Sequence, residues 1–369
     1  MAEKKKKYSA AKTFGWSVLA LILGVLLGFI LVSYYFFPKD KGEFPVSGDL
    51  QFHFLELGNK YNGDSIYVKA GETDILIDAG SRADSADDIS SYVDRYCTDG
   101  VLEYVIATHA DQDHIAAFAG NGSNPSLFTH YECEVIIDFP LTNTDSNTYQ
   151  NYVAAREAET EAGAKHYTAL QCYRETGGAQ RFYELSDGIT MEILYNYYYE
   201  NESSDENNYS VCLLFRQGGR SFLLTGDLEE KGEEYLVEYN DLPEVELFKA
   251  GHHGSKTSST EALLSVIRPK IVCVCCCAGH NQYGAKPENV FPTQAMIDRV
   301  ANYTDRVYVT SLYDEESESE ASMNGTIVVT ASASGVTVSG SHNDTLLKDT
   351  AWFLANRTMP AAWENKKIA

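Results

Sequence analysis

Two histidines and two aspartates lie within six positions, and they constrain the fold of this chain more than any other sequence feature. These side chains are His109, Asp111, Asp113 and His114, and they follow the apolar residues 104–107. The apolar run is typical of a buried strand, so the four side chains can converge at one strand end. Imidazole and carboxylate groups are the ligands that first-row divalent metals prefer. The pattern therefore predicts a metal site, with a solvated polar loop as the alternative.

Two later segments also lead from an apolar strand to metal-binding side chains. The apolar residues 222–224 precede Asp227, and a short strand expected at residues 244–250 precedes His252 and His253. A Gly-Asp pair is common in ordinary turns, so Asp227 is the weaker signal. Neighbouring side chains of an extended segment point in opposite directions. We therefore expect one histidine to bind metal and the other to face the substrate or to steady the site.

Strand-like and helix-like segments alternate along residues 49–340, which we expect to form one domain. The pattern predicts helices at residues 86–96 and 149–164. It predicts strands at residues 52–57, 65–70, 74–78, 104–108, 135–139, 211–215, 221–225, 244–250, 270–277, 306–310, 326–330 and 335–338. Two mostly antiparallel sheets between helices, an α/β arrangement, would fit this order. Periodicity alone leaves other mixed folds open.

Three further segments complete the reading of this part of the chain. The tyrosine-rich residues 195–209 are expected to form a loop, and residues 341–369 a tail with one short helix around Trp352 and Phe353. Four cysteines lie within the apolar residues 271–278 without the paired spacing of a zinc site. We interpret them as small apolar side chains of a buried strand.

The first 48 residues have the composition of a membrane anchor. Residues 1–13 are rich in lysine, residues 14–37 contain no charged side chain, and residues 38–48 form a polar linker. The uncharged span is long enough to cross a hydrocarbon core of ~30 Å as a helix. A cleavable signal peptide is the alternative, but its apolar core is usually only ~7–15 residues long. The preceding lysines predict a cytoplasmic amino terminus and an extracellular domain after Pro38.

The formal net charge of the chain is −24. Proteins that hold nucleic acid mainly through its phosphates have a basic surface. The charge therefore argues against tight, non-specific DNA binding, although a small local basic patch remains compatible with it.

The motifs together resemble those of the metallo-β-lactamase superfamily, in the same order, over residues 52–338. Within it, the chain is similar to the hydrolase domain of ComEC-type DNA-uptake proteins and to stand-alone relatives such as cell-surface phosphorylcholine esterases. The matching segments are residues 62–65, 76–80, 109–114, 207–210, 224–227, 251–255 and 281–284. One departure is that residues 283–287 lack the histidine of the family's Tyr-Gly-His-Pro, which alters a contact on the substrate side.

The resemblance implies an αββα sandwich of the metallo-β-lactamase fold and two divalent metal ions. One ion would be bound by His109 and Asp111, the other by Asp113, His114 and His253, and Asp227 would bridge both. Because Asp111 offers an oxygen ligand, manganese is compatible with the site as well as zinc.

The same resemblance implies roles for the remaining motif residues. The catalytic residues would be Asp113, Asp227 and His252, and the substrate would be bound by Asn208, His252, Asn281 and Tyr283. The favoured activity is phosphodiester hydrolysis at the cell surface, on DNA, a phosphocholine polymer or a small phosphodiester. A carboxylic or thioester hydrolase and a non-catalytic surface binding module are the alternatives, and the oligomeric state stays open.

Overall fold

The computed structural model describes residues 49–284 and 286–364. The predicted basic segment, membrane span and linker, residues 1–48, lie outside the described residues. Among the helices that the structure describes, none is long and apolar enough to cross a membrane.

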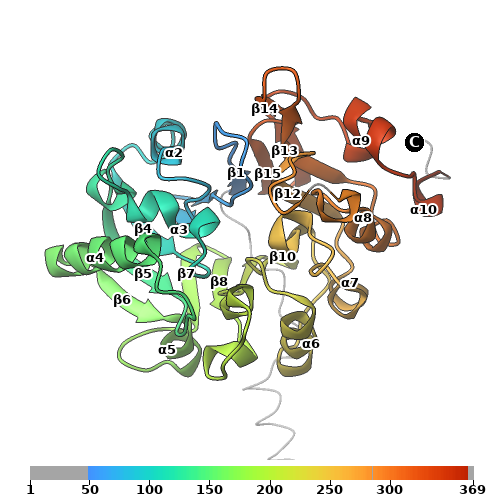
Figure 1. Cartoon of the computed structure of the whole chain (residues 1–369). Coiled ribbons are helices and arrows are strands. Elements are labelled where there is room, and N and C mark those ends of the chain that lie inside the picture. Colours follow the sequence, from blue (N-terminus) through green and yellow to red (C-terminus); the bar gives the residue numbers. More distant parts are fainter. Residues whose placement is uncertain (1–48, 285, 365–369) are drawn as a thin grey trace, which may run out of the picture. The chain divides into compact units, whose positions relative to one another are not determined.

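Two eight-stranded sheets form the centre of the fold (Figure 1). The first sheet runs in the order β16 (Gly335–Gly340), β15 (Ile327–Ser332), β1 (Leu50–Phe54), β2 (Ile66–Ala70), β3 (Thr73–Ile77), β4 (Val101–Ile106), β5 (Glu132–Asp138) and β6 (Lys165–Thr168). The second runs in the order β14 (Ser319–Ser322), β13 (Val307–Asp314), β12 (Ile271–Ala278), β11 (Leu247–Lys249), β10 (Arg220–Leu224), β9 (Leu213–Gln217), β8 (Ile189–Ile193) and β7 (Phe182–Ser186).

Helices pack on the outer side of each sheet (Figure 1). The first sheet packs against α2 (Ser85–Val93), α3 (Gln112–Ala119) and α4 (Asn147–Ala162), and the second against α6 (Glu230–Tyr239), α7 (Glu261–Ile267) and α8 (Gln294–Val300). The remaining short helices are α5 (Ala169–Arg174), α9 (Ala351–Asn356) and α10 (Ala361–Glu364). The 3₁₀ turns are η1 (Leu127–Thr129), η2 (Tyr197–Tyr199), η3 (Glu206–Tyr209), η4 (Gly251–Gly254), η5 (Pro287–Asn289) and η6 (Leu347–Asp349).

Each sheet combines antiparallel hairpins with a parallel array. Strands β3 to β6 pair in parallel in the first sheet, as do β10 to β13 in the second. The predicted two-sheet α/β sandwich is confirmed, but antiparallel pairings outnumber parallel ones only four to three in each sheet. Parallel neighbours need crossover connections, and the sequence pattern does not predict α6, α7 or α8. These helices have only seven to ten residues, too few for a clear helical period.

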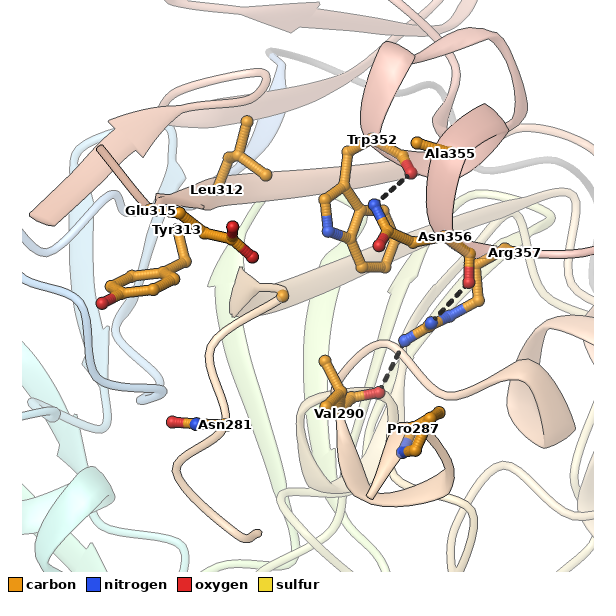
Figure 2. Close-up of a pocket in the computed structure, with 11 residues that line it drawn as sticks. Asn281, Pro287, Val290, Leu312, Tyr313, Glu315, Trp352, Ala355, Asn356 and Arg357 are labelled. Atoms are coloured by element: carbon orange, nitrogen blue, oxygen red, sulfur yellow. Dashed lines mark hydrogen bonds between the residues drawn. The ribbon is translucent and has the colours of Figure 1, made fainter. Parts of the chain in front are cut away.

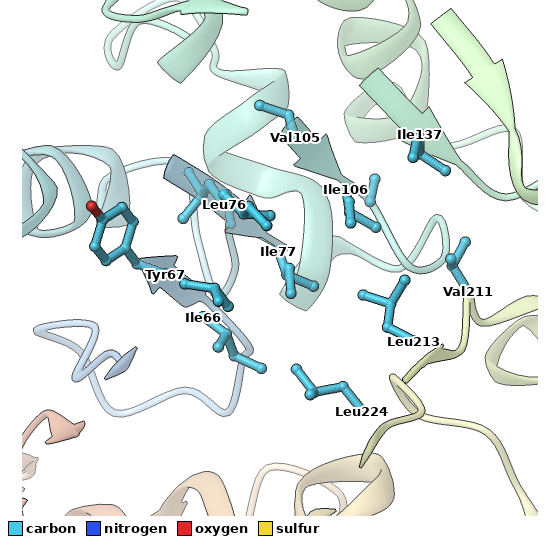
Figure 3. Packing of buried hydrophobic residues seen from close by; sticks show 14 of the residues in the cluster. Ile66, Tyr67, Leu76, Ile77, Val105, Ile106, Ile137, Val211, Leu213 and Leu224 are labelled. Carbon is cyan, nitrogen blue, oxygen red and sulfur yellow. The ribbon is translucent and has the colours of Figure 1, made fainter. Parts of the chain in front are cut away.

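Apolar side chains from both sheets interdigitate between them. The ring of Phe52 in the first sheet lies 5.2 Å from that of Phe215 and 5.1 Å from that of Phe222 in the second. Figure 3 shows the neighbouring part of this core, where Ile66 and Ile77 of the first sheet and Leu213 and Leu224 of the second belong to one cluster. Packing at this density fixes the offset of the two sheets, because interdigitated side chains resist sliding.

A second apolar cluster lies between the second sheet and its helices. The cysteine-rich strand β12 is buried along its whole length, as the apolar interpretation of its four cysteines predicts. All eight cysteines of the chain are free thiols. The expected helix around Phe353 is α9, and both Phe353 and Trp363 are buried in this cluster. The segment after residue 340 therefore packs on the domain.

Removing the Phe52 ring tests this inter-sheet packing. Phe52→Ala should lower the free energy of unfolding by ~3–5 kcal/mol, because it removes a large buried side chain and leaves a cavity. The control is Phe182→Ala, since Phe182 is 50 % exposed and should contribute little. Chemical denaturation of both variants measures the difference, and equal losses would contradict the packing argument.

Candidate metal centre

The predicted metal-binding motifs meet where strands of the two sheets end. Residues 109–114 follow β4 of the first sheet, whereas Asp227 and His253 follow the parallel neighbours β10 and β11 of the second. Asp227 Oδ2 lies 3.1 Å from His114 Nε2 and 3.1 Å from His253 Nε2. Parallel strands end at the same edge of a sheet, so the topology delivers these side chains to one point.

Glycines allow the backbones at this point to approach closely. A Cβ atom on Gly80 would lie 1.6 Å from the carbonyl oxygen of Asp113, and one on Gly226 would lie 2.7 Å from Ser210 Oγ. Gly226 also has a φ of +55°, which favours glycine. Any larger residue at either position would displace a segment that carries a predicted ligand.

Three histidines direct one nitrogen each toward the centre. The Nε2 atoms of His109, His114 and His253 are buried and form no regular hydrogen bond within the described part of the chain, although those of His114 and His253 lie 3.1 Å from Asp227 Oδ2. The ring centroids of His109 and His114 are 4.1 Å apart, and those of His114 and His253 are 5.2 Å apart. Buried polar atoms without partners are rare and need an explanation. A bound divalent cation supplies one, so these residues fit a metal centre.

The opposite ring nitrogens hold the histidines in this orientation. Nδ1 of His114 lies 2.8 Å from Asp78 Oδ2, and Nδ1 of His253 lies 2.9 Å from the carbonyl oxygen of Cys275. His109 Nδ1 lies 3.1 Å from Thr108 Oγ1. Such outer contacts are typical of metal-binding histidines, because they fix the tautomer and the direction of the free nitrogen.

Carboxylates surround the histidines. Asp113 Oδ2 lies 3.4 Å from His253 Nε2 and accepts a hydrogen bond of 2.7 Å from the Tyr283 hydroxyl. Asp111 Oδ2 lies 3.6 Å from His109 Nε2, but the Asp111 side chain is 43 % exposed. All six predicted metal ligands therefore lie around one centre, with Asp111 at its solvent side.

The negative charge of the centre shifts the protonation of the histidines. Burial by itself lowers the pKa of His114, but Asp227 and Asp78 outweigh burial and raise that pKa well above its usual value. Burial also lowers the pKa of His253, but Asp227 and Asp64 outweigh burial and raise that pKa well above its usual value. The protein alone thus attracts positive charge to this point.

The sequence reasoning missed two residues of the centre, Asp64 and Lys249. Ligand atoms of Asp64, His114, Asp227 and His253 all lie within 4.8 Å of one another. Lys249 is buried and forms ion pairs with both Asp64 and Asp227. Asp64 belongs to the early Gly-Asp turn that the resemblance singled out. The sequence signal that could have pointed to Lys249 is its position, since it is a charged residue within an apolar strand.

The backbone of the paired histidines differs from the expected extended segment. His252 and His253 have φ values of 47° and 52° and lie in the 3₁₀ turn η4. Their side chains nevertheless diverge. His253 points into the centre, whereas His252 Nδ1 lies 3.2 Å from Glu229 Oε1 and 3.3 Å from Thr257 Oγ1. The expected extended backbone was wrong, and the turn itself separates the two rings.

An open cavity of about 430 Å³ lies over the centre. Its walls include the predicted residues Asp111, Asp113, Asp227, His252 and Tyr283, together with Arg82, Gln112, Asn207 and Gln282. Arg82, Asn207 and Gln282 were not expected here. They bring a cation and two amides to the rim.

Two predicted substrate-binding residues lie elsewhere. The Asn208 amide contacts Ser203 Oγ at 3.3 Å and the Glu229 backbone N–H at 3.3 Å, so its neighbour Asn207 takes the place at the cavity. Asn281 lines a separate cavity beside Trp352 and Tyr313 (Figure 2). The spacing of a motif does not reveal which of two adjacent amides faces the site.

Comparison with known proteins agrees with this geometry. The sequence pattern of the Metallo-beta-lactamase superfamily matches residues 58–120 and 205–280, which contain all six predicted metal ligands. Among solved structures, the comparison includes the metallo-beta-lactamase fold protein YhfI from Bacillus subtilis. It has a TM-score of 0.41 and 11% sequence identity, over 70% of this chain and 95% of that one.

Curated relatives match about half of the chain. The ComE operon protein 3 of Bacillus subtilis is 30% identical over 46% of this chain and 19% of its own length. The Recombination protein 2 of Haemophilus influenzae is 28% identical over 58% of this chain and 21% of its own length. The chain thus spans about a fifth of the length of these relatives. The predicted resemblance is confirmed: this chain is related to the metallo-beta-lactamase superfamily and, within it, to the ComEC-like competence proteins.

Proposed function

We propose that this domain is a two-metal hydrolase that cleaves phosphodiesters at the cell surface. The observation that carries the proposal is the convergence of two buried Nε2 atoms, those of His114 and His253, on the Asp227 carboxylate, with the buried Nε2 of His109 beside Asp111, at an open cavity. A binding module without catalysis would not need buried ligands that remain unpartnered next to a solvent-accessible cavity.

The residues divide between the two ions as the resemblance implies. His109 and Asp111 would hold one ion, Asp113, His114 and His253 the other, and Asp227 would contact both. When bound, zinc or manganese ions supply Lewis acidity and a water nucleophile that forms near neutral pH. We expect the ion on the Asp111 side to bind more weakly than the other ion, because the Asp111 side chain is the most exposed of the six predicted metal ligands.

His252 is placed to handle a proton at the cavity wall. It faces the cavity, and its Nδ1 lies 3.2 Å from Glu229 Oε1. Burial opposes ionisation of Glu229, but contacts with His252, Asp205 and Thr257 outweigh burial and lower the pKa of Glu229 to about 2. An ionised Glu229 holds the His252 ring, so that Nε2 can donate a proton to a leaving oxygen.

The cavity rim supports an anionic substrate. Arg82 is the one arginine or lysine among the described residues that line it, and the Arg82 guanidinium lies 3.9 Å from the centre of the Tyr61 ring. A guanidinium is suited to the oxygens of a phosphodiester. The names of the relatives refer to competence and recombination, which is compatible with DNA as the substrate, beside a phosphocholine polymer or a small phosphodiester.

Membrane attachment belongs to the same proposal. The uncharged residues 14–37, preceded by lysines, would anchor the chain with the domain outside the cell. Attachment would keep the hydrolase near polymers at the cell surface.

The two neighbouring histidines give the sharpest test of the metal assignment. We expect about two divalent ions per wild-type chain and loss of most of the metal in Asp227→Ala and His253→Ala. His252→Ala should keep its metal but lose turnover by ~10²–10⁴-fold, as expected for a general acid. Elemental analysis gives the metal content of all three variants, and steady-state assays give their turnover rates. The assignment is wrong if His252→Ala loses metal and His253→Ala keeps it.

The substrate class is tested with bis-p-nitrophenyl phosphate, p-nitrophenyl phosphorylcholine and p-nitrophenyl acetate. We expect hydrolysis of the phosphodiesters, and a rise of roughly 10- to 150-fold in KM for them in Arg82→Ala, since a charged hydrogen bond is worth ~1.5–3 kcal/mol. The control is Arg95→Ala, because Arg95 is exposed and does not line the cavity. Preference for the acetate, unchanged in Arg82→Ala, would point to an ester hydrolase instead.

Protease treatment of intact cells tests the membrane orientation. The part of the chain after Pro38 should be digested from outside, while the cytoplasmic lysine-rich end stays protected until the membrane is broken. Complete protection of the domain in intact cells would refute an extracellular location.

A further inference from the structure

Lys249 is the last residue of β11 and is buried beside the metal centre, with a 1 % exposed side chain. Its Nζ donates to the carbonyl oxygen of Gly226 at 2.8 Å and to Asp227 Oδ1 at 3.0 Å. It also forms an ion pair with Asp64. A buried ammonium group is costly unless it is paired, and here two carboxylates and a carbonyl surround it.

Asp64 reaches Lys249 from the opposite sheet. It precedes β2, and its backbone N–H donates to the carbonyl oxygen of Asp113 at 3.0 Å. The Asp64 side chain is 1 % exposed and lies between Lys249 and His253, whose Nδ1 is 3.2 Å from Asp64 Oδ1. That same Nδ1 lies closer, at 2.9 Å, to the carbonyl oxygen of Cys275. Lys249 is therefore the main partner of Asp64.

These contacts divide the two oxygens of Asp227 between two tasks. Oδ1 faces Lys249 at 3.0 Å, and Oδ2 faces His114 and His253 at 3.1 Å each. Without Lys249, the carboxylate could rotate, because the donor that orients Oδ1 would be gone. The Asp227 backbone N–H, which donates to Ser210 Oγ at 3.0 Å, does not restrain the side-chain torsion.

We propose that Lys249 is a positioning residue that makes Asp227 present Oδ2 to the metals, and that Asp64 is the counter-ion of Lys249 instead of a metal ligand. This inference rests on the proposed two-metal function. It extends that function by assigning the buried Asp64–Lys249 pair to the orientation of the bridging carboxylate.

Metal affinity in a variant without Lys249 distinguishes the positioning role from a purely electrostatic role and from a purely structural role. A lysine ammonium repels divalent cations, so removing it by electrostatics alone would tighten metal binding. If Lys249 positions Asp227, removing it must weaken metal binding, because the bridging ligand is no longer fixed. A purely structural lysine would change stability and leave metal affinity alone.

The test measures metal affinity by competition with a chelator, using zinc and manganese separately on the full chain. We expect Lys249→Met to bind metal ~10–100-fold more weakly, the usual cost of losing a partner that orients a ligand. Asp64→Asn removes one negative charge near the centre and should weaken metal binding less than Lys249→Met does, since Lys249 still holds Asp227. The matched control is Lys348→Met, because Lys348 pairs with Asp305 at 2.7 Å and belongs to neither the predicted ligands nor the cavity wall.

A double variant keeps the test valid if Lys249→Met folds poorly. Asp64→Asn with Lys249→Met removes the ammonium together with one of its two carboxylate partners, so less buried charge stays unpaired than in Lys249→Met alone. It should regain part of the melting temperature that Lys249→Met loses, while its metal affinity stays low.

Unchanged or tighter metal binding in Lys249→Met and in the double variant would overturn the positioning role. Loss of metal in Asp64→Asn as complete as in Asp227→Ala would make Asp64 a ligand and overturn its assignment as counter-ion. A wild-type chain that binds no metal would instead refute the proposed function, so the two failures are distinguishable.

Discussion

The carboxylate of Asp227 meets histidines from both sheets, and the candidate site depends on this meeting. His114 lies on α3, directly after the first sheet's β4, and His253 lies in η4, after the second sheet's β11. Both Nε2 atoms are 3.1 Å from the same oxygen. A shift of one sheet relative to the other would change both of these distances. The inter-sheet packing around Phe52 therefore also sets the geometry of the metal centre.

Burying so many carboxylates imposes a second constraint. Asp64, Asp78 and Asp227 are each 1–2 % exposed, and Lys249 is the one buried lysine that pairs with them in the described part of the chain. Like charges at this distance oppose folding unless cations offset them. Divalent ions would do so, which couples metal binding to the stability of the domain. The structure thus explains why the centre contains a resident ammonium group as well as imidazoles.

The sequence predicted most of the site because its ligands stand directly after apolar strands. His109, His114 and Asp227 follow such strands closely, and the structure brings them together. The role of Lys249 was not predicted, because the sequence of a short strand does not show which side chain its lysine will pair with. The place of Asp64 in the centre was not predicted, because its partners are distant in sequence. Asn208 and Asn281 lie away from the cavity, since side-chain direction in a turn depends on local torsions that composition does not reveal.

The sequence also predicted part of the fold. Hairpins such as β2–β3 and β15–β16 were predicted by their turn residues and alternating pattern, because both signals are local. The parallel arrays were not, because their pairings join strands that are not neighbours in a hairpin, and the choice of partner is not a local property of the sequence. By itself, the sequence determined the kinds of ligand, their order and their place at strand ends. Only the tertiary structure decided which atoms meet, because the Asp227–His114 and Asp64–Lys249 contacts join segments whose separation is set by the packing of two sheets.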